Sequence, residues 1–249
     1  MMEKVIVITG GSRGIGAATA YLAAERGYAV GVNYRHNHGA ANAVVEKIRQ
    51  QGGRAVAIAA DIAIEADIIT LFETVDKQLG TVTALVNNAG ILEAQMRVEN
   101  LNAARLNRIF TTNITGAFLC AREAVKRMST KHGGPGGAIV NVSSIAARLG
   151  AAGEYVDYAA AKGAIDTMTV GLAKEVAAEG IRVNAVRPGF IYTDIHADGG
   201  EPNRVDRVKK GLPMKRGGEA MEVAKAILWL LSDEASYTTG TFIEVAGGR

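Results

Sequence analysis

Cysteine is almost missing from this sequence, and a single thiol limits the disulfide chemistry that is open to it. Cys120 stands alone among 249 residues, in the apolar run Ala-Phe-Leu-Cys-Ala. A disulfide within the chain is therefore excluded, and we expect a buried, unreactive thiol. A protein without disulfides suits a reducing compartment, so we expect a cytoplasmic location.

Long apolar runs and dense basic stripes are missing as well. No stretch approaches the roughly 20 apolar residues of a membrane-spanning helix, and the first residues lack the small-residue cleavage site of a signal peptide. The formal net charge is only +3, and the basic residues are dispersed, except around Arg204, Arg207, Lys209 and Lys210. We therefore expect neither a membrane nor a nucleic acid as a partner.

A metal site is not indicated by the histidines. His36 and His38 are near neighbours, but no carboxylate or cysteine is spaced to complete a site around them. Apolar residues make up 48% of the chain and charged residues 21%, which is the composition of a globular protein with a sizeable core. We expect one domain over residues 1–249.

The N-terminal region carries the first sign of a binding site. An apolar, β-branched run at residues 4–9 predicts a buried strand. It leads into Gly10-Gly11-Ser12-Arg13-Gly14-Ile15-Gly16, and a helical run follows at residues 17–26. Glycines between a strand and a helix let the backbone approach a pyrophosphate, which the helix N-terminus then faces. This order favours a dinucleotide site over an ordinary turn.

The end of the second expected strand, residues 29–35, bears on the choice of dinucleotide. An acidic residue there would hold the ribose 2′-hydroxyl of NAD, but Asn33 and Arg35 occupy this place, and Arg13 lies in the glycine loop. Two guanidinium groups suit a 2′-phosphate. We therefore expect NADP(H) as the cofactor, with NAD(H) possible; the alternative is that Arg35 is simply solvated.

Strand and helix patterns alternate along the rest of the chain. Further strands are expected at residues 55–60, 82–86, 138–142, 181–187 and 241–245, with helices between them, including a long helix over residues 101–124. Residues 190–218 have little apolar periodicity and are expected to form a mobile lid. The alternation predicts an α/β fold, a single doubly wound Rossmann-type domain with a seven-stranded parallel sheet flanked by helices.

Tyr158 and Lys162 are the strongest candidates for chemistry. Residues four apart share one face of a helix, so an ammonium would lie beside a phenol. The phenol has an ordinary pKa of roughly 10, and a neighbouring positive charge lowers it toward neutrality. The alternative is an exposed pair on an ordinary helix.

Taken together, these motifs resemble the short-chain dehydrogenase/reductase family, in its branch of about 250 residues, along the whole chain. Thr9-Gly-x-x-x-Gly14-x-Gly16 resembles its cofactor motif, and Asp61-Ile62 its adenine-pocket pair. Asn87-Asn88-Ala89-Gly90 is similar to its sheet-stabilising motif. Its catalytic tetrad is matched by Asn113, Ser144, Tyr158 and Lys162.

The resemblance implies a role for each matched residue. Tyr158 would exchange the proton with the substrate oxygen, Lys162 would lower its pKa and reach the nicotinamide ribose, and Ser144 would donate to the substrate oxygen. Asn113 would hold a water that links Lys162 to solvent. The implied cofactor-binding residues are Gly10, Ser12, Arg13, Gly14, Ile15, Gly16, Asn33, Tyr34, Arg35, Asp61, Ile62, Asn88, Ala89, Gly90, Tyr158, Lys162, Pro188, Gly189, Ile191 and Thr193.

For two positions of the expected tetrad, the serine and the tyrosine, a second residue of the same type lies nearby. Ser143 precedes Ser144, and the alternation of a strand sends the two to opposite sides; alignment with the family favours Ser144. Tyr155 has Ala159 four residues on and so lacks a lysine partner; we expect it to line the pocket. The expected substrate-pocket residues are Ser144, Glu93, Gln95, Arg148, Glu154, Tyr155 and His196.

This polar set favours an NADP(H)-dependent oxidoreductase for a small polar carbonyl or alcohol, similar to the bacterial glucose 1-dehydrogenase-like members. The alternative is a 3-oxoacyl-[acyl-carrier-protein] reductase, which shares these motifs and would need cations such as Lys131 and the cluster at 204–210 to dock an acidic carrier. A remote alternative is a non-catalytic NADP(H)-sensing regulator, for which the intact tetrad is unfavourable. The resemblance also implies a homo-oligomer, often a tetramer.

Overall fold

The computed structural model describes residues 4–249. Its seven strands form one sheet in the order β3-β2-β1-β4-β5-β6-β7, and every neighbouring pair is parallel. The strands span Lys4–Ile8 (β1), Tyr28–Tyr34 (β2), Ala55–Ala59 (β3), Ala84–Asn87 (β4), Gly137–Val142 (β5), Ile181–Pro188 (β6) and Phe242–Val245 (β7). The predicted doubly wound, seven-stranded sheet is confirmed.

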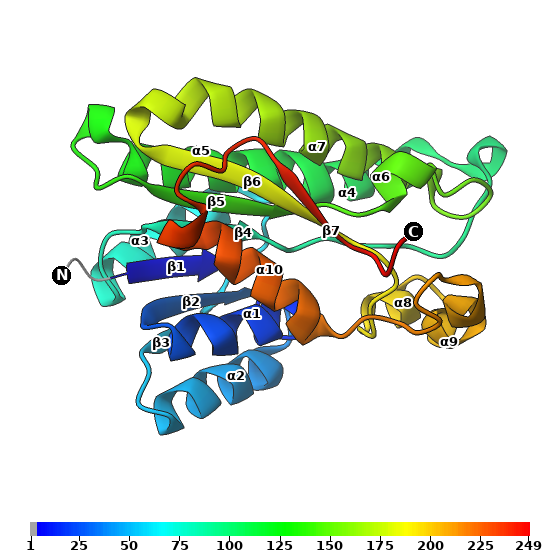
Figure 1. Cartoon of the computed structure of the whole chain (residues 1–249), viewed down its shortest axis with the longest axis horizontal. Helices are drawn as coiled ribbons and strands as arrows, with labels where there is room; N and C mark the ends of the chain where they lie inside the picture. The colour runs from blue at the N-terminus through cyan, green and yellow to red at the C-terminus, as the bar shows by residue number, and fades with distance from the viewer. Residues whose placement is uncertain (1–3) are drawn as a thin grey trace.

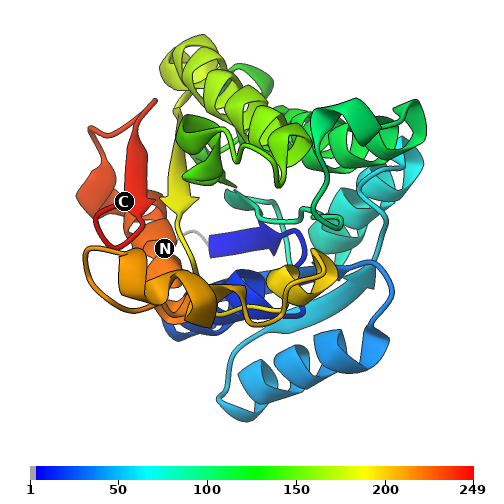
Figure 2. The same ribbon diagram turned by 90° about the vertical axis from the view of Figure 1, so that its right-hand side faces the viewer.

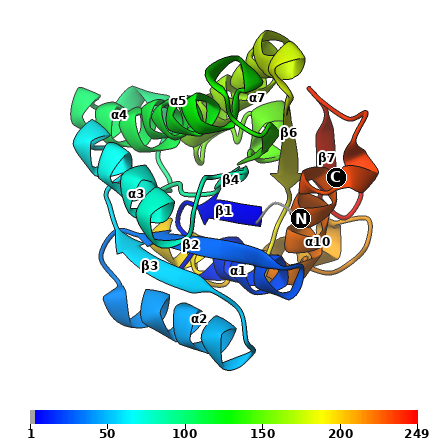
Figure 3. The ribbon, with the colours of Figure 1, turned by 90° about the vertical axis from the view of Figure 1, so that its left-hand side faces the viewer.

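Helices cover both faces of the sheet, as Figure 3 shows end-on. The longer ones are α1 (Gly14–Glu25), α2 (His38–Gln50), α3 (Glu65–Gln78), α4 (Ala103–Phe110), α5 (Gly116–Met128), α7 (Val156–Val176) and α10 (Ala220–Leu231). Short helices are α6 (Ala146–Leu149), α8 (Ile195–Asp198) and α9 (Arg204–Val208), with single turns η1 (Val98–Asn100), η3 (Thr130–His132), η4 (Ala177–Glu179), η5 (Lys209–Gly211) and η6 (Asp233–Ala235).

Two apolar layers hold the sheet between the helices. On one face, α1, α2 and α10 pack against it through residues such as Ala20, Ile48 and Ile227. On the other face, α3, α5 and α7 pack through residues such as Phe72 and Ile165. Because both faces are covered, β1 and β2 are apolar in almost every position and buried almost throughout. Cys120 lies in the second layer, where burial raises the pKa of its thiol to about 12.

The predicted helix over residues 101–124 differs from the structure. It begins at Ala103, runs to Met128, and is interrupted by a π-helical turn, η2, at Thr111–Thr115. A π turn widens the helix locally and re-aims one side chain, and such turns are frequent at functional sites. Here the residue at its centre is Asn113.

The carboxyl ends of the strands meet at one edge of the molecule. In Figure 1 the strands point to the right, and α8 and α9 lie beyond their ends. Figure 2, viewed from that side, shows the segment with α8 and α9 crossing in front of the sheet. The predicted lid at residues 190–218 therefore contains two short helices. It is anchored at both ends by the pairing of Ile191 with Gly218.

Candidate active site

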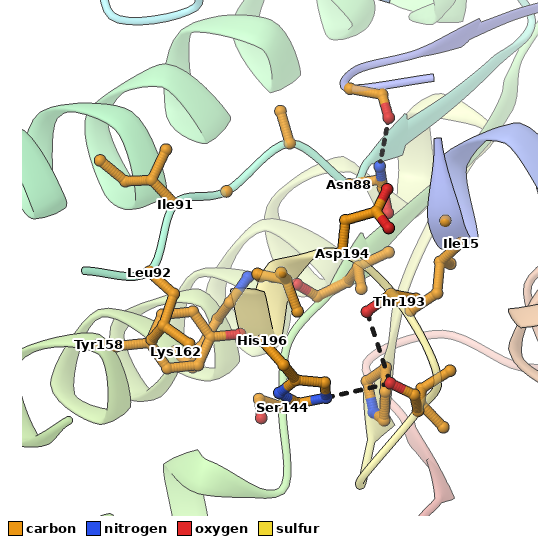
Figure 4. Close-up of a pocket in the computed structure, with 18 of the residues that line it drawn as sticks. Ile15, Asn88, Ile91, Leu92, Ser144, Tyr158, Lys162, Thr193, Asp194 and His196 are labelled. Atoms are coloured by element: carbon orange, nitrogen blue, oxygen red, sulfur yellow. Dashed lines mark hydrogen bonds between the residues drawn. The ribbon is translucent and has the colours of Figure 1, made fainter. Parts of the chain in front are cut away.

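One large cavity lies at this edge, with a volume of about 740 Å³. It runs from the glycine loop after β1, past the ends of β2 and β4, to the residues that follow β5 and β6. The strand order reverses between β1 and β4, and ligands of doubly wound sheets bind in the crevice at such a reversal. Figure 4 shows residues from these separate segments turned toward one space.

The glycine loop is shaped to approach a ligand closely. Gly10 and Gly14 have positive φ angles of 62° and 54°, which other residues rarely adopt. The N-cap residue of α1, Arg13, makes no side-chain cap hydrogen bond, and the first turn of α1 contains no acidic residue. By contrast, α2 is capped by Asn37, which accepts from the backbone N–H of Ala40 at 2.9 Å. The start of α1 thus offers the uncapped N–H groups that a pyrophosphate requires, so the residues fit a dinucleotide.

The two predicted phosphate-binding arginines each have a carboxylate partner. Arg35 Nε lies 2.8 Å from Asp61 Oδ2. Arg13 binds Asp198 of the lid and lies 3.9 Å from Asp194. Both arginine side chains stay about half exposed, at 53% and 55%, so each guanidinium keeps donors free to meet a phosphate in the cavity.

Asn33 is a different case from the arginines. It borders the cavity but is only 2% exposed. Its amide donates to the carbonyl of Ala60 at 3.0 Å, and its carbonyl oxygen accepts from Gly10 N–H at 3.2 Å. The side chain therefore holds the glycine loop against β3, and its contribution to a cofactor is indirect.

Tyr158 and Lys162 lie together in the cavity, on the first turns of α7. The Lys162 ammonium is 5.5 Å from the centroid of the Tyr158 ring and donates to the Val142 carbonyl at 2.7 Å. Burial raises the pKa of Tyr158 to about 12, with a hydrogen bond from Ser144 opposing the shift. Burial lowers the pKa of Lys162 to about 8, against the charge of Asp166. The shift of the phenol pKa thus comes from burial and the Ser144 hydrogen bond, and the lowering of that pKa by Lys162 stays a prediction.

Ser143 and Ser144 face opposite ways, as the alternation of the strand predicts. Ser143 is 2% exposed, and its hydroxyl donates to the backbone carbonyl of Lys162 at 3.2 Å. Ser144 is hydrogen-bonded to Tyr158, and its oxygen also accepts from Ala146 N–H at 3.1 Å. Only Ser144 therefore stands beside the phenol, where a substrate oxygen would lie.

Asn113 reaches the site without bordering the cavity. Its amide oxygen accepts from Ile91 N–H at 2.8 Å and its amide nitrogen donates to Ile91 O at 2.9 Å. A Cβ placed on Gly90 would lie 2.9 Å from the Asn113 oxygen and 3.6 Å from Lys162 Nζ. The π turn thus brings Asn113 beside the loop after β4 and close to Lys162.

The remaining cofactor candidates fall into two groups. Those that border the cavity are Gly10, Ser12, Gly14, Ile15, Tyr34, Asp61, Ile62, Asn88, Ala89, Gly90, Pro188, Gly189, Ile191 and Thr193. Gly16 does not border it. A Cβ at Gly16 would lie 2.3 Å from Gly10 O and 2.6 Å from Asn88 Nδ2, so this glycine lets α1 pack against the loop. Asn88 fixes the same loop by donating to the carbonyls of Thr9 and Gly10.

Comparisons with known proteins agree with this geometry. Residues 10–249 match a family model described as enoyl-(acyl carrier protein) reductase. An uncharacterized oxidoreductase of Escherichia coli strain K12 is 63% identical over 98% of this chain and 99% of its own. A 3-oxoacyl-[acyl-carrier-protein] reductase of Bos taurus is 40% identical over 99% and 98% of the two chains. Glucose 1-dehydrogenase 2 of Bacillus subtilis is 36% identical over 98% and 94%.

The chain belongs to the short-chain dehydrogenase/reductase family. It is an oxidoreductase that uses a nicotinamide cofactor. The crystal structure of a dehydrogenase/reductase from Sinorhizobium meliloti 1021 has the same fold, with a TM-score of 0.91, 33% identity, and coverage of 100% of this chain and 95% of that one.

The substrate end of this dehydrogenase/reductase differs from the predicted pocket. Glu93, Gln95 and Arg148 do not border the cavity. Glu93 is ion-paired with Arg108, Gln95 donates to Glu201, and Arg148 is ion-paired with Glu244. The structure therefore does not bring these three residues to the cavity, because surface ion pairs and hydrogen bonds hold their side chains elsewhere.

The other predicted pocket residues, Glu154, Tyr155 and His196, border the cavity together with Ser144. Sequence reasoning missed its apolar wall and two further arginines. These residues are Ile91, Leu92, Ile145, Leu149, Phe190, Ile195, Arg204 and Arg249. Leu92, Leu149 and Phe190 follow β4, β5 and β6, so the rule that loops at the carboxyl edge form the pocket would have found them. The sequence indicates Arg204 only as a docking cation, and nothing in it points to Arg249.

No metal-binding group of three or more His, Cys, Asp or Glu side chains occurs within residues 4–249. His38, one of the two neighbouring histidines, is hydrogen-bonded to Tyr34 and Asn42. In the same range, no helix has both the length and the hydropathy needed to cross a bilayer.

Proposed function

We propose that this dehydrogenase/reductase interconverts a carbonyl and a secondary alcohol on a free small molecule, with NADP(H) as the preferred cofactor. The observation that carries the proposal is the arrangement of Ser144, Tyr158 and Lys162 at one end of a cavity whose other end holds Arg13 and Arg35. One end supplies a proton donor and the other supplies guanidinium groups for a 2′-phosphate.

Each residue of the tetrad has a role that its contacts support. When bound, the nicotinamide supplies or accepts the hydride at the substrate carbon. Tyr158, protonated at neutral pH, donates its proton to the developing alkoxide in reduction. Ser144 donates to the same oxygen and stabilises its charge. Lys162, with a pKa near 8, can return a proton to the phenol, and Asn113 holds the backbone of Ile91 beside it.

A free substrate is favoured over a protein-bound one because three of the five expected docking cations are neutralised. Arg204 binds Glu154, Arg207 binds Glu201, and Lys209 binds Asp206 at 2.6 Å. An acidic carrier protein would have to compete with these carboxylates. A 3-oxoacyl-[acyl-carrier-protein] reductase remains the second candidate, because the apolar wall of Leu92, Leu149 and Phe190 suits an acyl chain and a 40% identical relative carries that name.

The test is a substrate panel assayed with NADPH and NADH by the absorbance of the reduced nicotinamide. It should contain ketones, hydroxy ketones, sugars, acetoacetyl-CoA and an acetoacetyl carrier protein. We expect turnover of free carbonyl compounds with NADPH. Turnover confined to the carrier-bound substrate would establish the second candidate. Tight NADPH binding with no turnover at all would favour a regulator. A tetramer and a cytoplasmic location remain part of the proposal.

A further inference from the structure

Two polar atoms at the substrate end of the cavity are buried without a hydrogen-bond partner. They are His196 Nδ1 and Arg204 Nη1, and both side chains border the same cavity as Ser144 and Tyr158. Figure 4 draws the His196 ring at the Ser144 end of this space, away from Ile15 of the glycine loop. Buried polar atoms nearly always have partners, so this pair requires an explanation.

His196 offers an acceptor. Its Nε2 lies 3.0 Å from the backbone carbonyl of Ile191. A carbonyl oxygen can only accept, so Nε2 carries the proton and Nδ1 of the neutral ring presents a lone pair. Burial lowers the pKa of His196, and the charge of Arg204 adds to that effect against the Ile191 hydrogen bond and Glu201. The ring is therefore neutral near pH 7.

Arg204 offers a donor in a fixed orientation. The residue is only 7% exposed, and its Nη2 binds Glu154. Its guanidinium lies 4.6 Å from the Tyr155 ring centroid and 5.4 Å from that of Phe190. Nη1 is 3.6 Å from Glu201 Oε2, too far for a hydrogen bond, and Glu201 is already bound to Arg207 and Gln95.

We propose that His196 and Arg204 form a subsite that binds a hydroxyl group of the substrate. A hydroxyl both donates and accepts, so it can donate to His196 Nδ1 while it accepts from Arg204 Nη1. A carboxylate would accept from Arg204 but would set its own lone pairs against Nδ1, and Glu154 and Glu201 already balance the arginine charge. A methyl group would leave both atoms unpaired. The inference rests on the proposed function and narrows its substrates to hydroxy ketones and the corresponding diols.

The apolar wall agrees with such a substrate. Leu92, Leu149 and Phe190 can cover the carbon skeleton. Ser144 and Tyr158 then bind one oxygen, and His196 and Arg204 bind the other. A site built to hydrogen-bond a hydroxyl rejects an analogue that lacks it much more strongly than an apolar pocket separates two alkyl groups.

The test compares α- and β-hydroxy ketones with the ketones of the same chain that carry hydrogen in place of the hydroxyl. We expect the wild-type enzyme to show a kcat/KM at least about tenfold higher for a hydroxy ketone than for its matched ketone. His196→Leu removes the acceptor together with the Nε2 donor, and Arg204→Met removes the Arg204 donor. In each variant, the ratio of kcat/KM for the hydroxy ketone to that for the matched ketone should fall close to one. This expectation holds also where both values are lower than in wild type.

Matched controls are His132→Leu and Arg108→Met. His132 lies in η3, outside the cavity, and Arg108 is paired with Glu93 on the surface, so both variants should keep the wild-type ratio. The wild-type comparison needs no variant to fold. Equal turnover of the matched ketones would overturn the subsite and leave the proposed function standing. Reduction of neither ketone, with NADPH bound, would contradict the proposed function and the subsite together.

Discussion

The Lys162 ammonium lies 5.5 Å from the centre of the Tyr158 ring and donates its hydrogen bond to Val142 O, at 2.7 Å. The two groups are thus neighbours in a buried site, with their pKa values shifted in opposite directions by the same desolvation. Lys162 therefore titrates near pH 8 and Tyr158 only near pH 12, an order that keeps a proton donor in place at neutral pH.

The lysine shift predicts a pH-dependent stability. The pKa of Lys162 falls from 10.5 to about 8 on folding, so above about pH 8 the unfolded chain binds more protons and stability rises with pH. This contribution amounts to about 3 kcal/mol by about pH 10. Folding raises the pKa values of Tyr158 and Cys120 to about 12. Above the pKa that each group has in the unfolded chain, its contribution to stability therefore falls as pH rises.

Urea unfolding of wild type and Lys162→Met from about pH 7 to about pH 10 isolates the lysine contribution. The unfolding free energy of wild type minus that of Lys162→Met should increase as pH rises. A difference that stays constant across this range would mean that the ammonium is not desolvated.

Substitutions of the two adjacent serines should have different effects, one on the reaction rate and the other on stability. Ser144→Ala removes the hydrogen bond to Tyr158 and to the developing alkoxide, and should lower kcat by roughly 10²- to 10³-fold. Ser143→Ala removes only the bond to Lys162 O and should cost about 1 kcal/mol of stability. Steady-state kinetics and thermal unfolding of both variants provide the check; a larger loss of kcat in Ser143→Ala would reverse the assignment.

Cofactor preference should depend on Arg13, Arg35 and the lid. Arg35→Ala should lower the ratio of kcat/KM for NADPH to that for NADH by roughly tenfold or more, since it removes a charge-assisted hydrogen bond to the 2′-phosphate. Asp198→Asn frees Arg13 from its ion pair and should raise the same ratio. Arg97→Ala, which breaks only a surface pair with Glu99, serves as the control. An unchanged ratio in Arg35→Ala would remove the basis for the NADP(H) preference.

Two helix glycines should respond differently to an added methyl group. Gly16→Ala would place its Cβ 2.3 Å from Gly10 O, so we expect a loss of about 3 kcal/mol of stability and weaker cofactor binding. Gly39 at the start of α2 has only an ordinary contact, 3.7 Å from Asn37 Oδ1. Gly39→Ala should therefore be neutral, or stabilising by up to about 1 kcal/mol. Equal melting temperatures for the two variants would contradict the packing role of Gly16.

The fold could be predicted because its signals are local. Each strand is a short β-branched or apolar run, each crossover contains a helical run, and Gly10, Gly14 and Gly16 have the spacing that a strand–loop–helix turn requires. The expected tetrad rests on the same kind of signal, since Ser144 follows a strand and Tyr158 and Lys162 are four residues apart. The π turn around Asn113 has no such local signal.

The substrate end could not be predicted from local patterns. Whether Glu93 or Arg148 faces the cavity depends on its ion-pair partner, Arg108 or Glu244, 15 and 96 residues away. Arg204 enters the cavity because Glu154 and the ring of Tyr155, about 50 residues earlier, hold it there. The upward shift of the Tyr158 pKa could not be predicted either, because its largest cause is burial, which depends on the whole fold.

The most direct test of proton donation by Tyr158 compares Tyr158→Phe with Tyr155→Phe in NADPH-dependent reduction of the best carbonyl substrate. Both tyrosines border the cavity, but the Tyr155 hydroxyl donates to Gly199 O at 3.1 Å and has no part in the chemistry. We predict that Tyr158→Phe lowers kcat by roughly 10²- to 10⁴-fold while NADPH still binds, and that Tyr155→Phe keeps most of the rate. A Tyr158→Phe enzyme with a near wild-type kcat would contradict the account.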